Sequence, residues 1–250
     1  MDKLSFLGLI LAGTAILTSQ KIEGVHLDTL FNLPALLIVL GGSVGAVVLE
    51  TSKSNLVRAF KMMFWVFFPP KFNIDKLQDD VLRWNGILKK EGILGLEREM
   101  ETTPDPFNNR ALQLCVDGHD AIEIQHLLEL EADNEHDRCM SSSHVFESLG
   151  GYSPTMGILG AVLGLTHVLR QLNEPSQLGA GIAVAFVATI YGVAFANLVF
   201  LPIANKLKQR VEERLYLRRI VLMGVVAMAE GKGTRALQNK LQSFGGKKRI

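Results

Sequence analysis

Four long apolar stretches, none of which contains an aspartate or a glutamate, dominate the pattern of hydrophobic and polar positions along the chain. They run over Leu4–Ser19, Leu30–Leu49, Leu149–Leu169 and Leu178–Asn205. A bilayer core of about 30 Å requires about 20 apolar residues in a helix, so the pattern predicts four membrane spans, the first of which is short. Because these spans hold no carboxylate of their own, an ion-moving function would need a partner chain to supply one.

The segment Thr51–Phe68 differs from the spans because lysine and arginine interrupt its apolar positions. The aromatic residues Phe60, Phe64, Trp65 and Phe68 gather on the apolar side, and Pro69-Pro70 ends the segment. This mixture predicts an amphipathic helix lying in the inner-leaflet interface, in contact with lipid. An ordinary buried amphipathic helix is the alternative.

The rest of the charged middle segment also has helical periodicity, and no strand-like alternation persists anywhere. Helices are predicted over Ile74–Lys90, around Leu94–Met100, over Asn109–Leu114 and from His119 to about Glu147. The fourth span is expected to continue as one helix from Gly181 to Ile220, about 60 Å long at 1.5 Å per residue. The predicted fold is therefore an all-α membrane protein with four transmembrane helices and a helical cytoplasmic domain between spans two and three.

The predicted organisation has four segments. These are two spans in residues 1–50, the interface helix and cytoplasmic domain in 51–148, two spans in 149–205, and a basic cytoplasmic helical tail in 206–250.

The net charge of +1 conceals a strong asymmetry between the middle segment and the tail. Glu50–Gly150 contains 11 Lys/Arg against 18 Asp/Glu, whereas Asn205–Ile250 contains 12 Lys/Arg against 3 acidic residues. Together with the short connections Gln20–Thr29 and Gln171–Gln177, this distribution places both termini and the middle segment in the cytoplasm by the positive-inside rule. Cys115 and Cys139 are expected to be unbridged thiols.

Few residues at membrane depth could carry chemistry. Glycines recur at helix-packing spacing, at Gly41 and Gly45 and again at Gly157, Gly160 and Gly164. Of the hydroxyl groups in the spans, that of Thr189, beside Tyr191, is predicted to face a water-filled path, although bonding to its own helix is the common alternative.

Enzymatic and cofactor-binding signals are missing from the sequence. No GxSxG, Walker A or HExxH motif occurs, and the histidines and aspartates near 119–137 do not have zinc-site spacing. We therefore expect no enzymatic activity, no cofactor, no metal and no nucleic-acid partner. The charged cluster around Lys90 and Glu97 indicates either a solvated helix face or a docking patch for another charged protein.

The segments VFESLGGYSPTMGILGAVLGLTHVL and GIAVAFVATIYGVAFANLVFLPIANKL closely resemble the third and fourth spans of the flagellar stator family of MotA and its sodium-driven counterpart PomA. The stretches KKEGILGLERE and LQLCVDGHD resemble the cytoplasmic domain of that family, and the likeness covers essentially the whole chain. The length and the FPP and PSQLG segments are most similar to the MotC or lateral-type branch.

The resemblance implies a bacterial inner-membrane complex of five such chains around two copies of a peptidoglycan-anchored, MotB-type single-span partner. Ion flow through the complex would turn the ring against the switch protein of the flagellar rotor. Pro154 and Pro202 match the two prolines that couple ion binding to motion. The rotor-facing positions implied are Lys89, Lys90, Glu97, Arg98 and Glu99. Lys89 stands where the family commonly has arginine, and Arg98 stands where PomA has an acid. The change from arginine to lysine loses the planar bidentate fork, so the contact at Lys89 is expected to be weaker.

The resemblance also bears on the ion. Thr189 matches a threonine of both proton-driven and sodium-driven members, whereas Ala161 stands where sodium-driven members have a second threonine. Sodium requires several oxygen ligands, so the missing hydroxyl favours protons. Two other functions remain open from the sequence, an ExbB/TolQ-like energiser of an envelope process and a static membrane scaffold.

Overall fold

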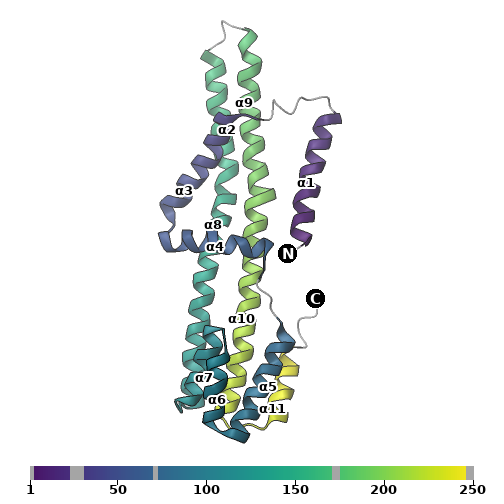
Figure 1. Cartoon of the computed structure of the whole chain (residues 1–250). Coiled ribbons are helices and arrows are strands. Elements are labelled where there is room, and N and C mark those ends of the chain that lie inside the picture. Colours follow the sequence, from purple (N-terminus) through teal and green to yellow (C-terminus); the bar gives the residue numbers. More distant parts are fainter. Residues whose placement is uncertain (1–2, 23–30, 70–72, 171–174, 246–250) are drawn as a thin grey trace. The chain divides into compact units, whose positions relative to one another are not determined.

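The structure, a computed structural model, describes residues 3–22, 31–69, 73–170 and 175–245, and these are all-α, as the sequence predicts (Figure 1). No strand occurs among the described residues. The α-helices are α1 (Lys3–Ile22), α2 (Leu33–Leu36), α3 (Gly42–Glu50), α4 (Lys53–Phe67), α5 (Ile74–Glu91), α6 (Ile93–Thr102), α7 (Pro106–Val116), α8 (Ala121–Arg170), α9 (Pro175–Ala194), α10 (Leu201–Ala229) and α11 (Thr234–Gly245). Two π-helical stretches, Leu37–Gly41 and Phe195–Phe200, join α2 to α3 and α9 to α10.

The chain divides by its internal contacts into two units. The first comprises residues 1–70 and 138–210, and the second comprises 71–137 and 211–250. The segment boundaries predicted from the sequence follow the change from apolar to charged composition, whereas the two units follow packing. Residues 51–70 accordingly group with the apolar helices, and the tail from 211 onward groups with the charged middle segment.

Three of the described helical stretches are long and apolar enough to cross a membrane. They are Leu33–Glu50, which includes the first π-helical stretch, α8, and Gly181–Ala229, which includes the second. In α1 the apolar part is shorter, at Ile10–Ser19. The short first stretch noted in the sequence is thus the one that falls below the length of a full span.

One continuous helix replaces two predicted elements in the second half of the chain. The sequence suggested a helix from His119 to about Glu147 followed by a separate span, but α8 runs through both without interruption for 50 residues. Nothing near residue 148 ends a helix, since Gly150 and Gly151 keep helical geometry and Pro154 lies inside α8. A proline inside a helix removes one hydrogen bond, but the flanking turns can continue.

The prediction of an uncapped continuation of the fourth span is confirmed. From Pro175 the chain remains helical through α9, the π-helical stretch Phe195–Phe200 and α10 as far as Ala229. The π-helical stretch ends two residues before Pro202, which has no N–H to offer the carbonyl of Leu198. At its end the Leu201 N–H instead bonds the Ala196 carbonyl, five residues back.

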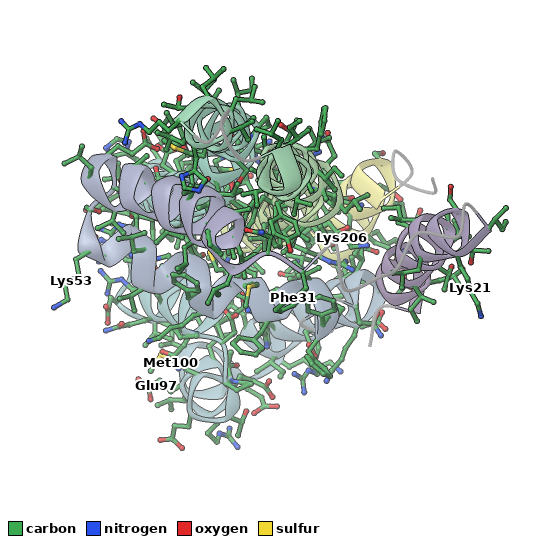
Figure 2. The ribbon with its side chains drawn as sticks, turned by 90° about the horizontal axis from the view of Figure 1, so that it is seen from above. Lys21, Phe31, Lys53, Glu97, Met100 and Lys206 are labelled. Atoms are coloured by element: carbon green, nitrogen blue, oxygen red, sulfur yellow. The ribbon has the colours of Figure 1, made fainter. Side chains whose placement is uncertain are left out.

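The predicted amphipathic helix is present as α4 and belongs to the first unit. Ser52 caps its start, because the side chain accepts a hydrogen bond from the Asn55 N–H. One face buries Ala59, Met62 and Val66, while Phe60, Phe64 and Phe68 on the other face are more than half exposed. The helix runs crosswise to α8 and α9, and Lys53 at its start points away from the ribbon (Figures 1 and 2).

The second unit has an ordinary globular core. Its buried side chains come from α5, α6, α7, the beginning of α8, the end of α10 and α11, and include Trp84, Leu96, Leu112, Ile124, Ile220 and Leu237. Gly92, with φ of +69°, ends α5 in the left-handed region and lets α6 begin at the next residue. This tight turn brings the end of α5 next to the start of α6.

Candidate functional site

A seam of small residues joins α8 to α9 in the first unit. Gly157, Gly160 and Gly164 of α8 lie against Ala185, Ala188 and Gly192 of α9. A Cβ atom at Gly157 would lie 2.9 Å from the Ala188 carbonyl oxygen, and one at Gly192 would lie 2.5 Å from the Ser153 carbonyl oxygen. Backbone approach this close is possible only where side chains are absent, as in the small-residue interfaces of membrane helices. The glycine spacing seen in the sequence at 157–164 is therefore used within the chain.

The seam lets us predict the effect of a single added methyl group. Gly192→Ala should push α9 away from the Ser153 carbonyl and destabilise the first unit by about 1–3 kcal/mol, the usual range for overpacking. The matched control is Gly151→Ala, because Gly151 lies on α8 with open space around it. Accumulation of the folded chain in membranes, followed through a heat ramp, is the measurement. Equal behaviour of the two variants would contradict the close packing.

The two predicted coupling prolines, Pro154 of α8 and Pro202 of α10, lie close to a contact between their two helices. Pro154 has no N–H for the carbonyl of Gly150, and Gly150 itself lies against Leu201, the residue before Pro202. A Cβ atom at Gly150 would be only 2.7 Å from the Leu201 Cδ2. The structure thus brings the weakened turn of α8 against the weakened start of α10, an arrangement that the sequence spacing did not indicate.

Two polar contacts tie α3 to α8 beside Pro154. Ser43 and Ser153 are fully buried, with their hydroxyl oxygens 3.3 Å apart, and each hydroxyl also bonds a carbonyl of its own helix. At the end of α3 the Tyr152 hydroxyl donates to the Glu50 carboxylate at 2.8 Å. None of these contacts was predicted from the sequence. The one available signal was that serine interrupts otherwise apolar helices at positions 43 and 153.

The residues predicted for the ion path have different surroundings. The Thr189 hydroxyl donates to the Ala185 carbonyl of its own helix over a long 3.5 Å, and its Cα lies against Gly157. Ala161 is half-buried on α8, one turn beyond Gly157. The Tyr191 hydroxyl accepts a hydrogen bond from the Asn32 N–H at 3.1 Å, at the start of α2. Thr189 therefore lies at the seam, Ala161 is one helical turn from Gly157 on α8, and Tyr191 supports α2; their roles toward an ion stay predictions.

The predicted rotor-facing residues separate into two groups. Arg98 pairs with Glu91 at 2.7 Å, and Glu99 pairs with Arg83 of α5 at 3.0 Å. Lys89, Lys90 and Glu97 are exposed and form no ion pair among the described residues, and Figure 2 shows Glu97 pointing away from the helices of its unit. The second group is therefore available to an external partner, whereas Arg98 and Glu99 also fix α6 on α5.

An ion network in the second unit was not foreseen. Arg218 of α10 has a side chain only 7% exposed, and it bonds Glu135 at 3.0 Å and also Asp105. Its guanidinium lies 4.6 Å from the centre of the Phe107 ring. Asp105 in turn caps α7 through the N–H groups of Phe107 and Asn108. Burial alone would raise the pKa of Asp105, but the hydrogen bond and charge of Arg218 hold it below its usual value.

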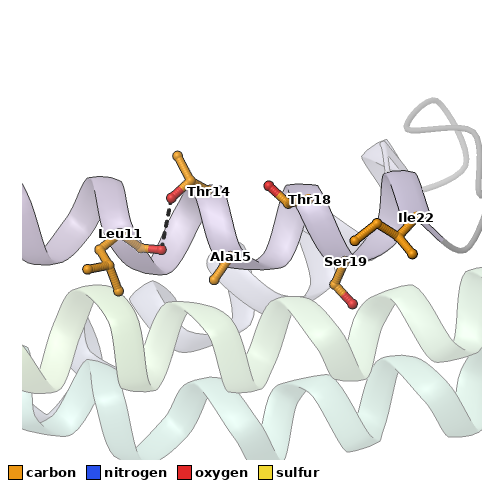
Figure 3. A pocket seen from close by; sticks show the side chains of 6 residues that line it. All are labelled: Leu11, Thr14, Ala15, Thr18, Ser19 and Ile22. Carbon is orange, nitrogen blue, oxygen red and sulfur yellow. Dashed lines mark hydrogen bonds between the residues drawn. The ribbon is translucent and has the colours of Figure 1, made fainter.

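Other candidate sites in the described residues carry no chemistry. No three His, Cys, Asp or Glu side chains there are placed to hold a metal. Neither Cys115 nor Cys139 forms a disulfide in the described part of the chain, and burial raises the pKa of Cys115 to about 11, which keeps this thiol protonated. An open hollow of about 510 Å³ runs along α1, but only α1 residues line it (Figure 3). Because all of its lining residues belong to α1, the hollow is one face of that helix. The Thr14 hydroxyl in it donates to the Leu11 carbonyl of the same helix.

Known proteins match this chain along nearly its whole length. Residues 99–219 match the family model described as the MotA/TolQ/ExbB proton channel family. Motility protein A of Bacillus subtilis is 32% identical over 246 residues, which cover 98% of this chain and 91% of that protein. The chain belongs to the MotA/TolQ/ExbB family. Membership makes it a channel subunit and not an enzyme, and confirms the resemblance found in the sequence.

Solved structures of the MotA/TolQ/ExbB family also match the fold. The Campylobacter jejuni MotAB structure superposes with a TM-score of 0.92 and 28% identity, covering 98% of this chain and 96% of the other. The flagellar MotAB stator complex of Bacillus subtilis matches with a TM-score of 0.85 and 32% identity, covering 96% and 94%. The long helices α8 and α10 and the seam between α8 and α9 thus occur in a chain whose fold is that of a stator subunit.

Proposed function

We propose that this chain is the ion-driven, torque-generating subunit of a flagellar stator. The full-length likeness to MotAB structures carries the proposal, because it extends over both units and is not confined to the matched family segment. The envelope energisers of the same family remain the alternative function, since the family description includes TolQ and ExbB.

In this function the chain crosses the bacterial inner membrane four times. The spans are α1, the helix ending at Glu50, the second part of α8, and α9 with the start of α10. Both termini and the second unit are cytoplasmic, in agreement with the basic tail and the short connections that face outward. The exposed aromatic face and basic residues of α4 fit a helix lying among lipid headgroups.

A MotB-type single-span partner completes the channel. The four spans contain no aspartate or glutamate except Glu50 at the end of α3, so the ion-carrying carboxylate comes from the partner. Five copies of this chain surround two copies of that partner, and the rotor switch protein contacts the cytoplasmic unit at Lys89, Lys90 and Glu97.

The turn around Pro154 is the element that moves when the ion binds and leaves. The proline removes one backbone hydrogen bond from α8, and the glycine seam lets α9 follow a small shift without side-chain interlocking. The contact of Gly150 with Leu201 passes the shift to the start of α10, beside Pro202.

Protons are the ion that the site chemistry favours. Thr189 places a hydroxyl at the seam, and Ala161 offers no side-chain oxygen one turn beyond Gly157. A proton needs only a carboxylate and a water path, whereas sodium needs a shell of oxygen ligands.

Rotation of tethered cells tests the function and the ion together. A host lacking its stators would carry this chain with its partner gene, in sodium-free buffer. Continued rotation is the expected result. Rotation only after sodium is restored would overturn the proton assignment, and no rotation in either buffer, with the complex present in the membrane, would favour the envelope energiser.

A further inference from the structure

Large apolar side chains are exposed at the same end of the second unit that carries the rotor-facing charges. Leu94 is 70% exposed and Ile93 is 46% exposed, although both belong to the unit with a globular core. Isolated exposed leucines are common, but an exposed apolar pair among charged residues at a proposed contact surface is typical of a protein interface.

The local backbone presents Leu94 rigidly. Gly92, at φ of +69°, turns the chain directly from α5 into α6. A Cβ atom at Gly95 would lie 2.5 Å from Ile87 and 2.8 Å from the Cβ of Glu91, so α6 packs closely on α5 at this point. Because both helices are fixed there, the leucine loses little freedom when a partner covers it.

Leu94 shares one exposed face of α6 with charged residues. Residues 94, 97, 98 and 101 follow the i, i+3, i+4, i+7 spacing of a helix face, and all four are exposed. The Arg98 guanidinium bonds the Glu91 carboxylate and approaches the Leu94 carbonyl at 3.5 Å. The ion pair therefore lies beside the leucine and is internally neutralised.

The charges that remain uncompensated flank this centre on both sides. Lys89 and Lys90 end α5 on one side, and Glu97 and Glu101 continue along α6 on the other. None of these four side chains forms an ion pair within the described part of the chain. A complementary partner therefore presents acidic groups toward α5 and basic groups toward α6.

We infer that Leu94, supported by Ile93, is the apolar anchor of the rotor-facing surface and enters an apolar pocket on the rotor protein, between its acidic and basic groups. The inference rests on the proposed function and names the residue that supplies the affinity. The charged residues steer and orient the encounter, while burial of the leucine slows dissociation.

The two kinds of contact respond differently to salt. Charge pairs at an exposed rim weaken as ionic strength rises, because the screening length shortens. Burial of an apolar side chain does not depend on charge and is not weakened by salt. Binding measured over a range of salt concentrations can therefore distinguish the contribution of Leu94 from that of Glu97.

The experiment measures binding of the membrane-embedded complex, this chain with its partner subunit, to the purified rotor protein at low and high ionic strength. Leu94→Ala should weaken binding about tenfold at both salt concentrations. Glu97→Lys should weaken binding strongly at low salt and much less at high salt. Ile122→Ala is the matched control, because Ile122 is a similar apolar side chain that is 81% exposed in the same unit. Swimming speed of cells carrying each variant gives a second readout.

Each other outcome would contradict a different part of the proposal. If Glu97→Lys weakens binding but Leu94→Ala behaves as Ile122→Ala does, the anchor is wrong and the rotor contact stands. If neither Leu94→Ala nor Glu97→Lys changes binding or swimming, the proposed rotor contact itself fails. If Leu94→Ala instead reduces the amount of assembled complex, the leucine contacts a neighbouring copy and the inference is overturned.

Discussion

Replacing Pro154 with leucine is expected to abolish torque while the complex still assembles in the membrane. Leucine supplies the N–H that proline lacks, so the Gly150 carbonyl regains its helical hydrogen bond and the weakened turn of α8 becomes regular. A proline inside a helix costs about 3 kcal/mol, so the substitution should stabilise α8 while removing its point of bending. The measurement is rotation of tethered cells, with membrane content of the chain determined in parallel.

The position of Pro154 explains why the effect should be large. The Pro154 Cα lies 3.2 Å from where a Cβ atom of Gly192 would be. Ser153, the residue before it, has its hydroxyl 3.3 Å from that of Ser43 and its carbonyl oxygen against Gly192. The control is Pro106→Leu, because Pro106 occupies the first turn of α7, where its missing N–H has no helical partner. Normal torque from the Pro154 variant would remove this residue from the coupling element.

Replacing Arg218 with methionine should destabilise the second unit by about 1–3 kcal/mol. The side chain is nearly buried, so its removal takes a charged hydrogen-bond donor from both Asp105 and Glu135. Arg214 still pairs with Glu135 at 2.6 Å, and the two carboxylates are partly exposed, which limits the loss. Arg219→Met is the matched control, since Arg219 is exposed beside it and its loss should change stability by less than about 0.5 kcal/mol. Unfolding can be followed by the fluorescence of Trp84, which is buried in the same core.

The pH dependence of unfolding provides a second test of this network. Because the pKa of Asp105 is lowered in the folded protein, its contribution to stability is present above the unfolded pKa of about 4 and is lost as pH falls through the folded value. The wild-type chain should therefore lose stability on acidification below about pH 4, and the Arg218→Met variant should lose less. The same acid sensitivity in both proteins would show that Arg218 does not hold the carboxylate.

Local sequence properties were sufficient for the presence of the helices and for most of their ends. The apolar stretches and the amphipathic pattern before Pro69 each act within a few residues, and the structure has helices where they predict them. The charged cluster around Lys90 and Glu97 was predicted to be a solvated face or a docking patch, and its side chains are exposed in the structure. The helix end predicted near Glu147 was wrong. The residues of α8 change there from charged to apolar, which alters the surroundings of the helix but does not end it.

The sequence by itself determined that this chain is helical, that it has apolar spans without an ion-holding carboxylate, and that glycines and prolines interrupt two of them. Only the tertiary structure decided which surfaces meet. It paired Gly157 with Ala188 and Gly192, brought Gly150 against Leu201, joined Ser43 to Ser153, and enclosed Arg218 between two carboxylates. Helix formation depends on neighbours three and four residues apart, which a sequence displays. Helix pairing depends on close contacts between residues that can be a hundred positions apart, and these follow from packing the whole chain.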